Sequence, residues 1–101
     1  MNNNQRLTLK STVSASKSQA SSELLGETVI LELNSGVYYG LNETGSLIWN
    51  SIQQSKTLEE IQDVILEKYE VEPQTCTYYI LELVQDLVDK GLVTVENEAV
   101  V

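Results

Sequence analysis

Alternating apolar and polar residues mark residues 27–42 as β-structure. In such a pattern every second side chain faces the same side of an extended chain. The sequence Asn34-Ser35-Gly36 interrupts the alternation and is typical of a tight turn, so the stretch predicts a hairpin. A second turn candidate, Leu25-Gly26, pairs residues 19–25 with the first strand of this hairpin. The pattern therefore predicts an antiparallel meander of three strands.

From Asn42 onward the apolar residues follow helical spacing. Asn42 is a suitable N-cap for a first helix that contains Trp49. Residues 57–60, Thr-Leu-Glu-Glu, form a capping box that begins a second helix. Pro73 suits the first turn of a third helix, and Gly91 suits the left-handed position that ends it. A meander followed by three helices predicts an α+β fold of the winged-helix class.

Shorter segments flank this predicted domain. Alternating apolar residues from Leu7 are compatible with an additional N-terminal strand, and residues 92–95 with a short C-terminal strand. The first residues are rich in Asn, Ser, Gln and Thr, a composition typical of disorder. We therefore expect a polar, partly disordered extension at residues 1–17, the winged-helix domain at residues 18–96 and a tail at residues 97–101.

The charge distribution restricts the partners of the chain. It has 15 acidic and 6 basic residues, which give a formal net charge of -9. All of the acids fall in residues 23–101. This charge disfavours nucleic acid and anionic membranes, because binding to phosphate groups requires Lys and Arg. Glu82, Asp86 and Asp89 share one face of the third helix, where they would repel a DNA duplex.

Residues suited to catalysis or metal binding are few. The chain has no histidine, and nothing near Cys76 would activate its thiol, so we interpret it as a small buried residue. The acids at residues 59–67 have the spacing of a solvated helix face. We expect no catalytic residue, no metal and no cofactor. The absence of an apolar run of about 18 residues, of an export signal and of a disulfide partner indicates a cytoplasmic protein without a membrane span.

The third helix is apolar over a wide arc. One stripe suffices for packing on the rest of the domain: Cys76, Ile80, Leu83 and Leu87. A second stripe consists of Leu81, Val84 and Val88. This second stripe either makes the helix more deeply buried or lines a groove. Residues 37–42 are the last strand of the meander, so we expect their outer edge to be unpaired. An unpaired edge beside an apolar helix is a template for adding an extended peptide as a further strand.

PqqD-like proteins carry a signature that resembles Gly36-Val37-Tyr38-Tyr39-Gly40-Leu41-Asn42-Glu43-Thr44-Gly45 followed by Ile48-Trp49. The similarity continues through the sequence TLEEIQDVILEKYEVEP and the helix end LVDKGLV. It covers about residues 19–95 and includes all of the predicted strands and helices in the same order. Within the family, the chain is most similar to the discrete proteins of lasso-peptide pathways.

The resemblance implies a RiPP recognition element, which is a non-catalytic module that binds the leader of a ribosomally made precursor peptide. It implies that the leader docks as an antiparallel strand and that a processing enzyme, such as a leader peptidase, a cyclase or a radical-SAM enzyme, then receives the precursor. On the strand, the implied contacts are Val37, Tyr38, Tyr39, Gly40, Leu41 and Asn42. On the third helix, they are Tyr78, Leu81, Glu82, Val84, Gln85, Val88 and Asp89.

Other interpretations remain open at this point. An acidic winged-helix protein can serve as a protein–protein adaptor or regulator without a leader-peptide ligand. Modules of this kind also occur fused to their enzymes, so the chain can be a fragment of an enzyme subunit. The unpaired edge is compatible with a monomer or with a homodimer.

Overall fold

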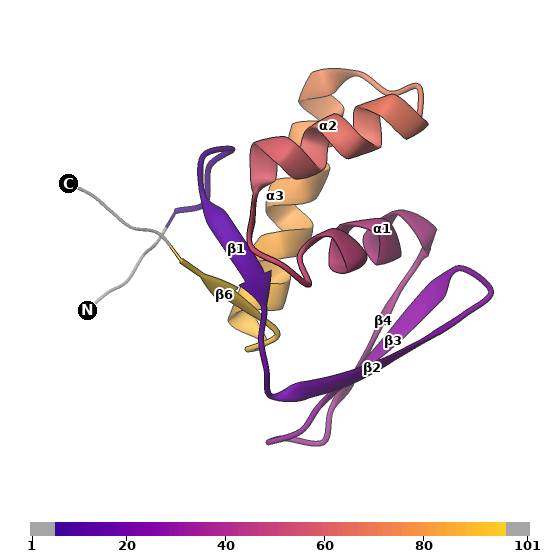
Figure 1. Cartoon of the computed structure of the whole chain (residues 1–101), viewed down its shortest axis with the longest axis vertical. Coiled ribbons are helices and arrows are strands. Elements are labelled where there is room, and N and C mark those ends of the chain that lie inside the picture. Colours follow the sequence, from indigo (N-terminus) through magenta and orange to yellow (C-terminus); the bar gives the residue numbers. More distant parts are fainter. Residues whose placement is uncertain (1–5, 97–101) are drawn as a thin grey trace.

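The computed structural model describes residues 6–96, which form an α+β fold with three helices and two three-stranded antiparallel sheets (Figure 1). The predicted tail at residues 97–101 and the first five residues of the predicted extension lie outside the described residues. The α+β class is therefore confirmed. The second sheet is an addition to the predicted meander.

The predicted meander is the sheet of β2 (Gln19–Leu24), β3 (Glu27–Glu32) and β4 (Tyr38–Leu41), in that order. Both connections are tight turns with left-handed residues. In the first turn Leu25 has φ 55° and Gly26 has φ 83°, and in the second Gly36 has φ 76°. A glycine adopts this conformation without steric cost, which explains why each turn contains one.

The second sheet joins segments that are far apart in the sequence. Its central strand is β1 (Thr12–Ala15), which pairs with β5 (Lys56–Thr57) on one side and β6 (Val93–Val95) on the other. The additional strands predicted near the two ends of the chain are therefore present. The domain boundary at residue 18 stays a prediction, but Leu7 and Val13, which precede it, are both buried in the core.

The three helices begin where the sequence predicts. The side chain of Asn42 caps α1 (Glu43–Ser51) by accepting from the Gly45 amide at 2.9 Å. α2 (Leu58–Lys68) begins with the predicted capping box, in which Thr57 accepts from the Glu60 amide and Glu60 accepts from the Thr57 amide. α3 (Pro73–Asp89) has Pro in its first turn.

One hydrophobic core connects both sheets with all three helices. α1 packs on the inner face of the meander, where Trp49 and Ile30 are almost fully buried. The Thr28 hydroxyl donates to the Ser46 hydroxyl at 2.7 Å inside this contact, so the two buried polar groups satisfy each other. Trp49 is therefore a core residue.

The apolar arc of α3 is used mainly for packing. Its buried residues are Cys76, Ile80, Val84 and Leu87. Leu83 was predicted to share this stripe but is only partly buried, and Val84 takes its place. Leu81 and Val88 are also partly buried against the core. The interpretation of α3 as a more deeply buried helix therefore accounts for most of its second stripe.

Candidate functional site

The candidate site begins with the outer edge of β4. Within residues 6–96, no strand pairs with this edge, because β4 is the last strand of its sheet. The Glu32 amide donates to the Val37 carbonyl at 2.9 Å, so these two residues form a hydrogen-bonded pair. Hydrogen-bonded and non-hydrogen-bonded pairs alternate along an antiparallel ladder. The pair of Ile30 with Tyr39 is therefore hydrogen-bonded, whereas Tyr38 lies in a non-hydrogen-bonded pair.

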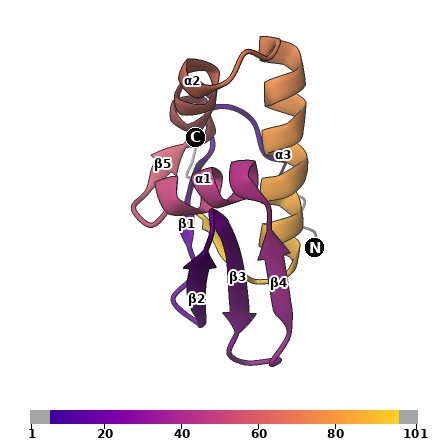
Figure 2. The ribbon, with the colours of Figure 1, turned by 90° about the vertical axis from the view of Figure 1, so that its right-hand side faces the viewer.

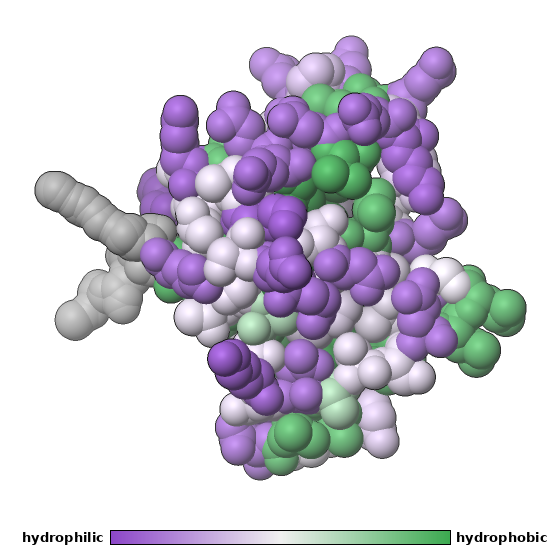
Figure 3. All heavy atoms as spheres, in the orientation of Figure 1, coloured by the Kyte–Doolittle hydropathy of each residue, from purple (hydrophilic) through white to green (hydrophobic). Residues whose placement is uncertain are grey.

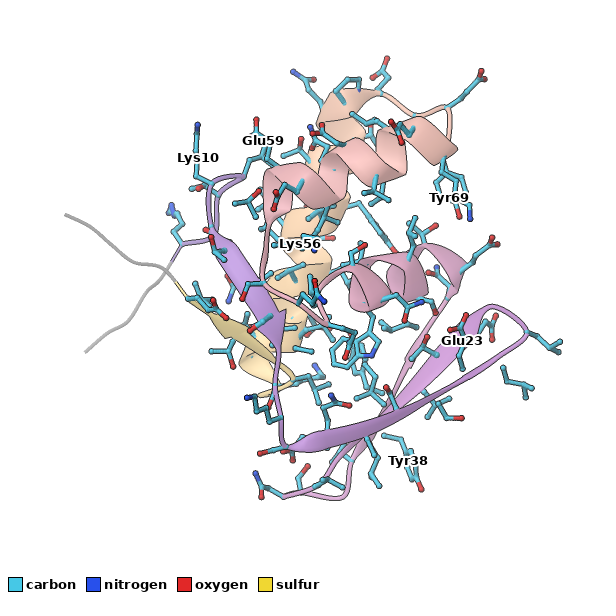
Figure 4. The ribbon with its side chains drawn as sticks, in the orientation of Figure 1. Lys10, Glu23, Tyr38, Lys56, Glu59 and Tyr69 are labelled. Atoms are coloured by element: carbon cyan, nitrogen blue, oxygen red, sulfur yellow. The ribbon has the colours of Figure 1, made fainter. Side chains whose placement is uncertain are left out.

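This alternation determines which backbone groups remain available. Tyr38 and Gly40 direct their N–H and C=O groups away from β3, toward the unpaired side of the sheet. We call this side of β4 the open edge. The side chain of Tyr38 is 68% exposed and points away from the helices (Figure 4). Gly40 is exposed and has free space where a Cβ would stand.

α3 stands beside the open edge (Figure 2). Three contacts connect the helix with β4. The Tyr39 hydroxyl donates to the Asp86 carboxylate, and Lys90 lies over the Tyr39 ring at 5.3 Å from its centroid. At the other end of the strand, the Tyr79 hydroxyl donates to the Asn42 side chain at 3.4 Å. These contacts hold α3 beside the strand, and we call the surface of α3 that runs along β4 the groove.

Two hollows lie along this groove. The large hollow has a volume of about 520 Å³ and is lined by Tyr79, Glu82, Leu83, Gln85, Asp86 and Asp89. The small hollow has a volume of about 320 Å³ and is lined by Glu32, Ser35, Val37, Tyr39, Lys90 and Leu92. The bonded cluster of Tyr39, Asp86 and Lys90 contributes to both linings and therefore lies between them.

The charges of this cluster are coupled. Lys90 binds Asp86 with an Nζ–Oδ1 distance of 2.8 Å. The hydrogen bond from Lys90, followed by the one from Tyr39, lowers the pKa of Asp86. Burial, followed by the bond to Asp86, raises the pKa of Tyr39 to about 12. At neutral pH Asp86 is therefore a carboxylate and Tyr39 a neutral phenol.

The strand residues implied by the resemblance differ in what they can offer a ligand. Tyr38 and Gly40 supply the outward backbone groups, and the Tyr39 side chain turns toward α3. Leu41 is buried in the core, where it cannot contact a ligand through its side chain. Val37 borders the small hollow, and Asn42 caps α1.

The helix residues implied by the resemblance also differ, because some line the large hollow and others are buried. Glu82, Gln85 and Asp89 line the large hollow. Tyr78 is exposed and donates to Glu82 at 3.1 Å. Val84 is fully buried, Leu81 and Val88 are partly buried against the core, and none of the three belongs to the lining of either hollow.

The predicted contacts omit three lining residues of the small hollow, Glu32, Ser35 and Leu92. They also omit four residues on α3 and at its C-terminal cap: Tyr79, Leu83, Asp86 and Lys90. Their spacing of three and four residues is a signal for a common helix face. It could have identified them as a group, but it does not show which helix face turns toward β4.

The described residues offer little else that resembles a reactive centre. They contain no group of three or more metal-ligating side chains. Cys76 is buried, and its burial raises the pKa of the thiol. Across the part of the chain that the structure covers, no helix combines the length and the apolar character needed to cross a membrane.

Comparisons with known proteins agree with this architecture. Residues 27–93 match the family described as "Coenzyme PQQ synthesis protein D (PqqD)". The fold is similar to the structure described as "TbiB1 in Complex with the TbiA(beta) Leader Peptide", with a TM-score of 0.75 and 32% identity over 86% of this chain and 99% of that chain.

A second solved structure has the same fold. It is described as "Lasso peptide synthetase B1 complexed with the leader peptide" and matches with a TM-score of 0.73 and 23% identity, over 81% of this chain and 96% of that chain. A search of curated protein sequences found no significant match. The family match, which includes all of β4 and α3, shows that the chain belongs to the PqqD family.

Proposed function

We propose that the protein binds the leader of a ribosomally made precursor peptide and presents the precursor to a modifying or leader-cleaving enzyme. The leader adds to the open edge of β4 as one more antiparallel strand. The observation that carries this proposal is the outward orientation of the N–H and C=O groups of Tyr38 and Gly40 beside the groove of α3. Edge strands of this kind bind extended peptides through main-chain hydrogen bonds, and neighbouring pockets select the side chains.

Two further observations support the proposal. The TbiB1 structure, which aligns with 86% of this chain at 32% identity, is a complex with a leader peptide. The open edge also lacks two features that commonly protect edge strands. β4 contains neither Pro nor a charged residue, and Tyr38, Tyr39 and Gly40 leave its backbone accessible on the outer side.

In this proposal the protein is a non-catalytic carrier of the winged-helix type. The partner enzyme, such as a leader peptidase, a cyclase or a radical-SAM enzyme, performs the chemistry. We expect the protein to act in the cytoplasm, where ribosomes make the precursor, as a monomer or a homodimer. The contacts comprise the backbone of β4 and the groove side of α3, with Glu82, Gln85 and Asp89 at its rim.

The test is a titration with the leader of the precursor encoded next to this protein. Backbone amide shifts in NMR spectra are expected at residues 37–42 and 75–89, with little change in β1 and α2. The absence of binding at high micromolar concentration of the correct leader would contradict the proposal.

One observation favours a second candidate function, that of a protein–protein adaptor without a leader-peptide ligand. The tip of the β2–β3 hairpin presents Leu24, 73% exposed, and Leu25, 94% exposed (Figure 3). Leu25 occupies a left-handed conformation that leucine rarely adopts. The adaptor function would be supported by a protein partner that binds without any leader. The double variant Leu24→Ser/Leu25→Asn should then lose this binding.

A further inference from the structure

The orientation of β4 determines where the side chains of an added strand point. An antiparallel strand bonded to Tyr38 and Gly40 places one of its residues opposite Tyr39. We call this residue of the peptide position p. Residues that lie opposite each other in a sheet project from the same face. The Tyr39 side chain turns toward α3, so the side chain at position p also points toward α3.

Position p therefore faces the large hollow. Its lining combines the apolar surface of Tyr79 and Leu83 with Gln85 and three carboxylates, those of Glu82, Asp86 and Asp89. Residues 6–96 supply no lysine or arginine to this lining. Lys90, from the neighbouring small hollow, binds Asp86 and can neutralise one of the three carboxylates. A cationic side chain at position p could pair with the remaining carboxylates and lay its methylene groups against Tyr79 and Leu83.

The small hollow receives the next inward side chain. Because the added strand runs antiparallel to β4, the peptide residue opposite Val37 is position p+2. Val37, Tyr39 and Leu92 supply apolar surface there, and Glu32, Ser35 and Lys90 complete the lining. A volume of about 320 Å³ can hold an aliphatic side chain. An apolar residue at position p+2 fits this lining best.

We propose that the groove selects leaders with lysine or arginine at position p, opposite Tyr39, and an aliphatic residue two positions later, opposite Val37. The inference rests on the leader-binding function proposed above and names the peptide chemistry that this groove recognises. It depends on the open edge and on the two hollows together. The carboxylates determine which side chain the large hollow accepts, whereas the backbone of β4 holds the peptide.

The probe is the leader of the precursor encoded next to this protein, prepared as synthetic peptides in which each residue in turn is replaced by Glu. Each peptide is titrated against the wild-type chain and against Glu82→Lys/Asp89→Lys, whose two substituted residues are exposed. The matched control is Asp63→Lys/Glu67→Lys on α2, where both residues are exposed and outside the two linings. It changes the net charge by the same amount.

We expect one Lys→Glu or Arg→Glu peptide to bind the wild-type chain about tenfold more weakly than the unmodified leader, because attraction to several carboxylates becomes repulsion. The same peptide should recover binding on Glu82→Lys/Asp89→Lys but not on the α2 control. A leader with Ala at the aliphatic position two residues later should bind weakly to all three proteins.

The outcomes separate this inference from the proposed function. If the leader binds but no basic position responds to the charge reversal on α3, or if the α2 control gives the same recovery, the recognition rule is wrong and leader binding stands. If the leader does not bind the wild-type chain, both are wrong. Circular dichroism on each variant establishes that the fold is retained.

Discussion

Tyr38→Pro is the most selective perturbation of the open edge. Proline has no backbone N–H and is tolerated on edge strands when the missing group faces outward. In β4 the ladder to β3 uses Val37, Tyr39 and Leu41, whereas the amide of Tyr38 points away from it. The substitution therefore removes one hydrogen bond to an added peptide and none from the sheet. Val37, which would precede the proline, lies just before the strand.

The size of the effect follows from the ladder. An added strand can form four backbone hydrogen bonds with β4, through the N–H and C=O groups of Tyr38 and Gly40. The loss of one bond costs about 0.5–1.5 kcal/mol, which weakens binding by about 2- to 13-fold. The proline ring also occupies space beside the incoming strand. We therefore expect the dissociation constant to rise about tenfold or more.

Two matched variants isolate the backbone contribution. Tyr38→Thr removes the same side chain but keeps the N–H, and it should bind the leader more tightly than Tyr38→Pro. Tyr39→Pro instead removes a bond within the ladder, leaves the Ile30 carbonyl without its partner and also deletes the side-chain bond to Asp86. It should lower the free energy of unfolding by about 1–3 kcal/mol.

The assay is fluorescence anisotropy of a labelled leader, with thermal unfolding recorded by circular dichroism for each variant. For a domain of this size, about 1 kcal/mol changes Tm by about 4–8 °C, so an intact sheet is easily distinguished from a damaged one. If Tyr38→Pro unfolds at the same temperature as Tyr38→Thr and binds the leader equally well, the peptide does not pair with β4 and the reasoning fails.

Three further predictions concern the structure around the site. Ile30→Ala should reduce the free energy of unfolding by about 2–5 kcal/mol in chemical denaturation, because Ile30 is fully buried beneath the meander. A loss of less than about 1 kcal/mol would contradict the close packing of Ile30 in the core. Thr57→Ala should cost about 1 kcal/mol in the same measurement, since it breaks the capping box with Glu60, whereas Thr57→Ser should retain most of it. In a tyrosinate absorbance titration one group should titrate near pH 12 and disappear in Tyr39→Phe. Because folding raises this pKa above the unfolded value near 10, its stabilising contribution is complete below pH 10 and is lost as the pH rises toward about 12. Asp86→Asn should lower the apparent pKa, and an unchanged titration would contradict the hydrogen bond.

Local sequence patterns predicted the elements well. The alternation around Asn34-Ser35-Gly36 and the turn at Leu25-Gly26 correspond to the β2–β4 meander. The caps at Asn42 and Thr57 also form as predicted. These signals are strong because strand alternation, turn chemistry and helix capping depend on residues within a few positions of one another.

Features that depend on distant residues were less accessible. β1 and β6 pair, although about 80 positions separate them, and β5 has only two residues. On α3 the helical period allows either Leu83 or Val84 to join the buried stripe. The packing of α2 and β6 against the helix leaves Val84 fully buried and Leu83 only partly buried. Leu83 turns to the groove instead.

The sequence by itself determined the strands, the helices, the acidic charge and the signature shared with the PqqD family, because each depends on residues close together in the chain. Only the tertiary structure decided the composition of the groove. Tyr39 meets Asp86 across 47 positions, and this contact shows which face of α3 lies along the open edge. The physical reason is that a helix exposes several possible faces, and only its packing against the rest of the core selects the one that a ligand meets.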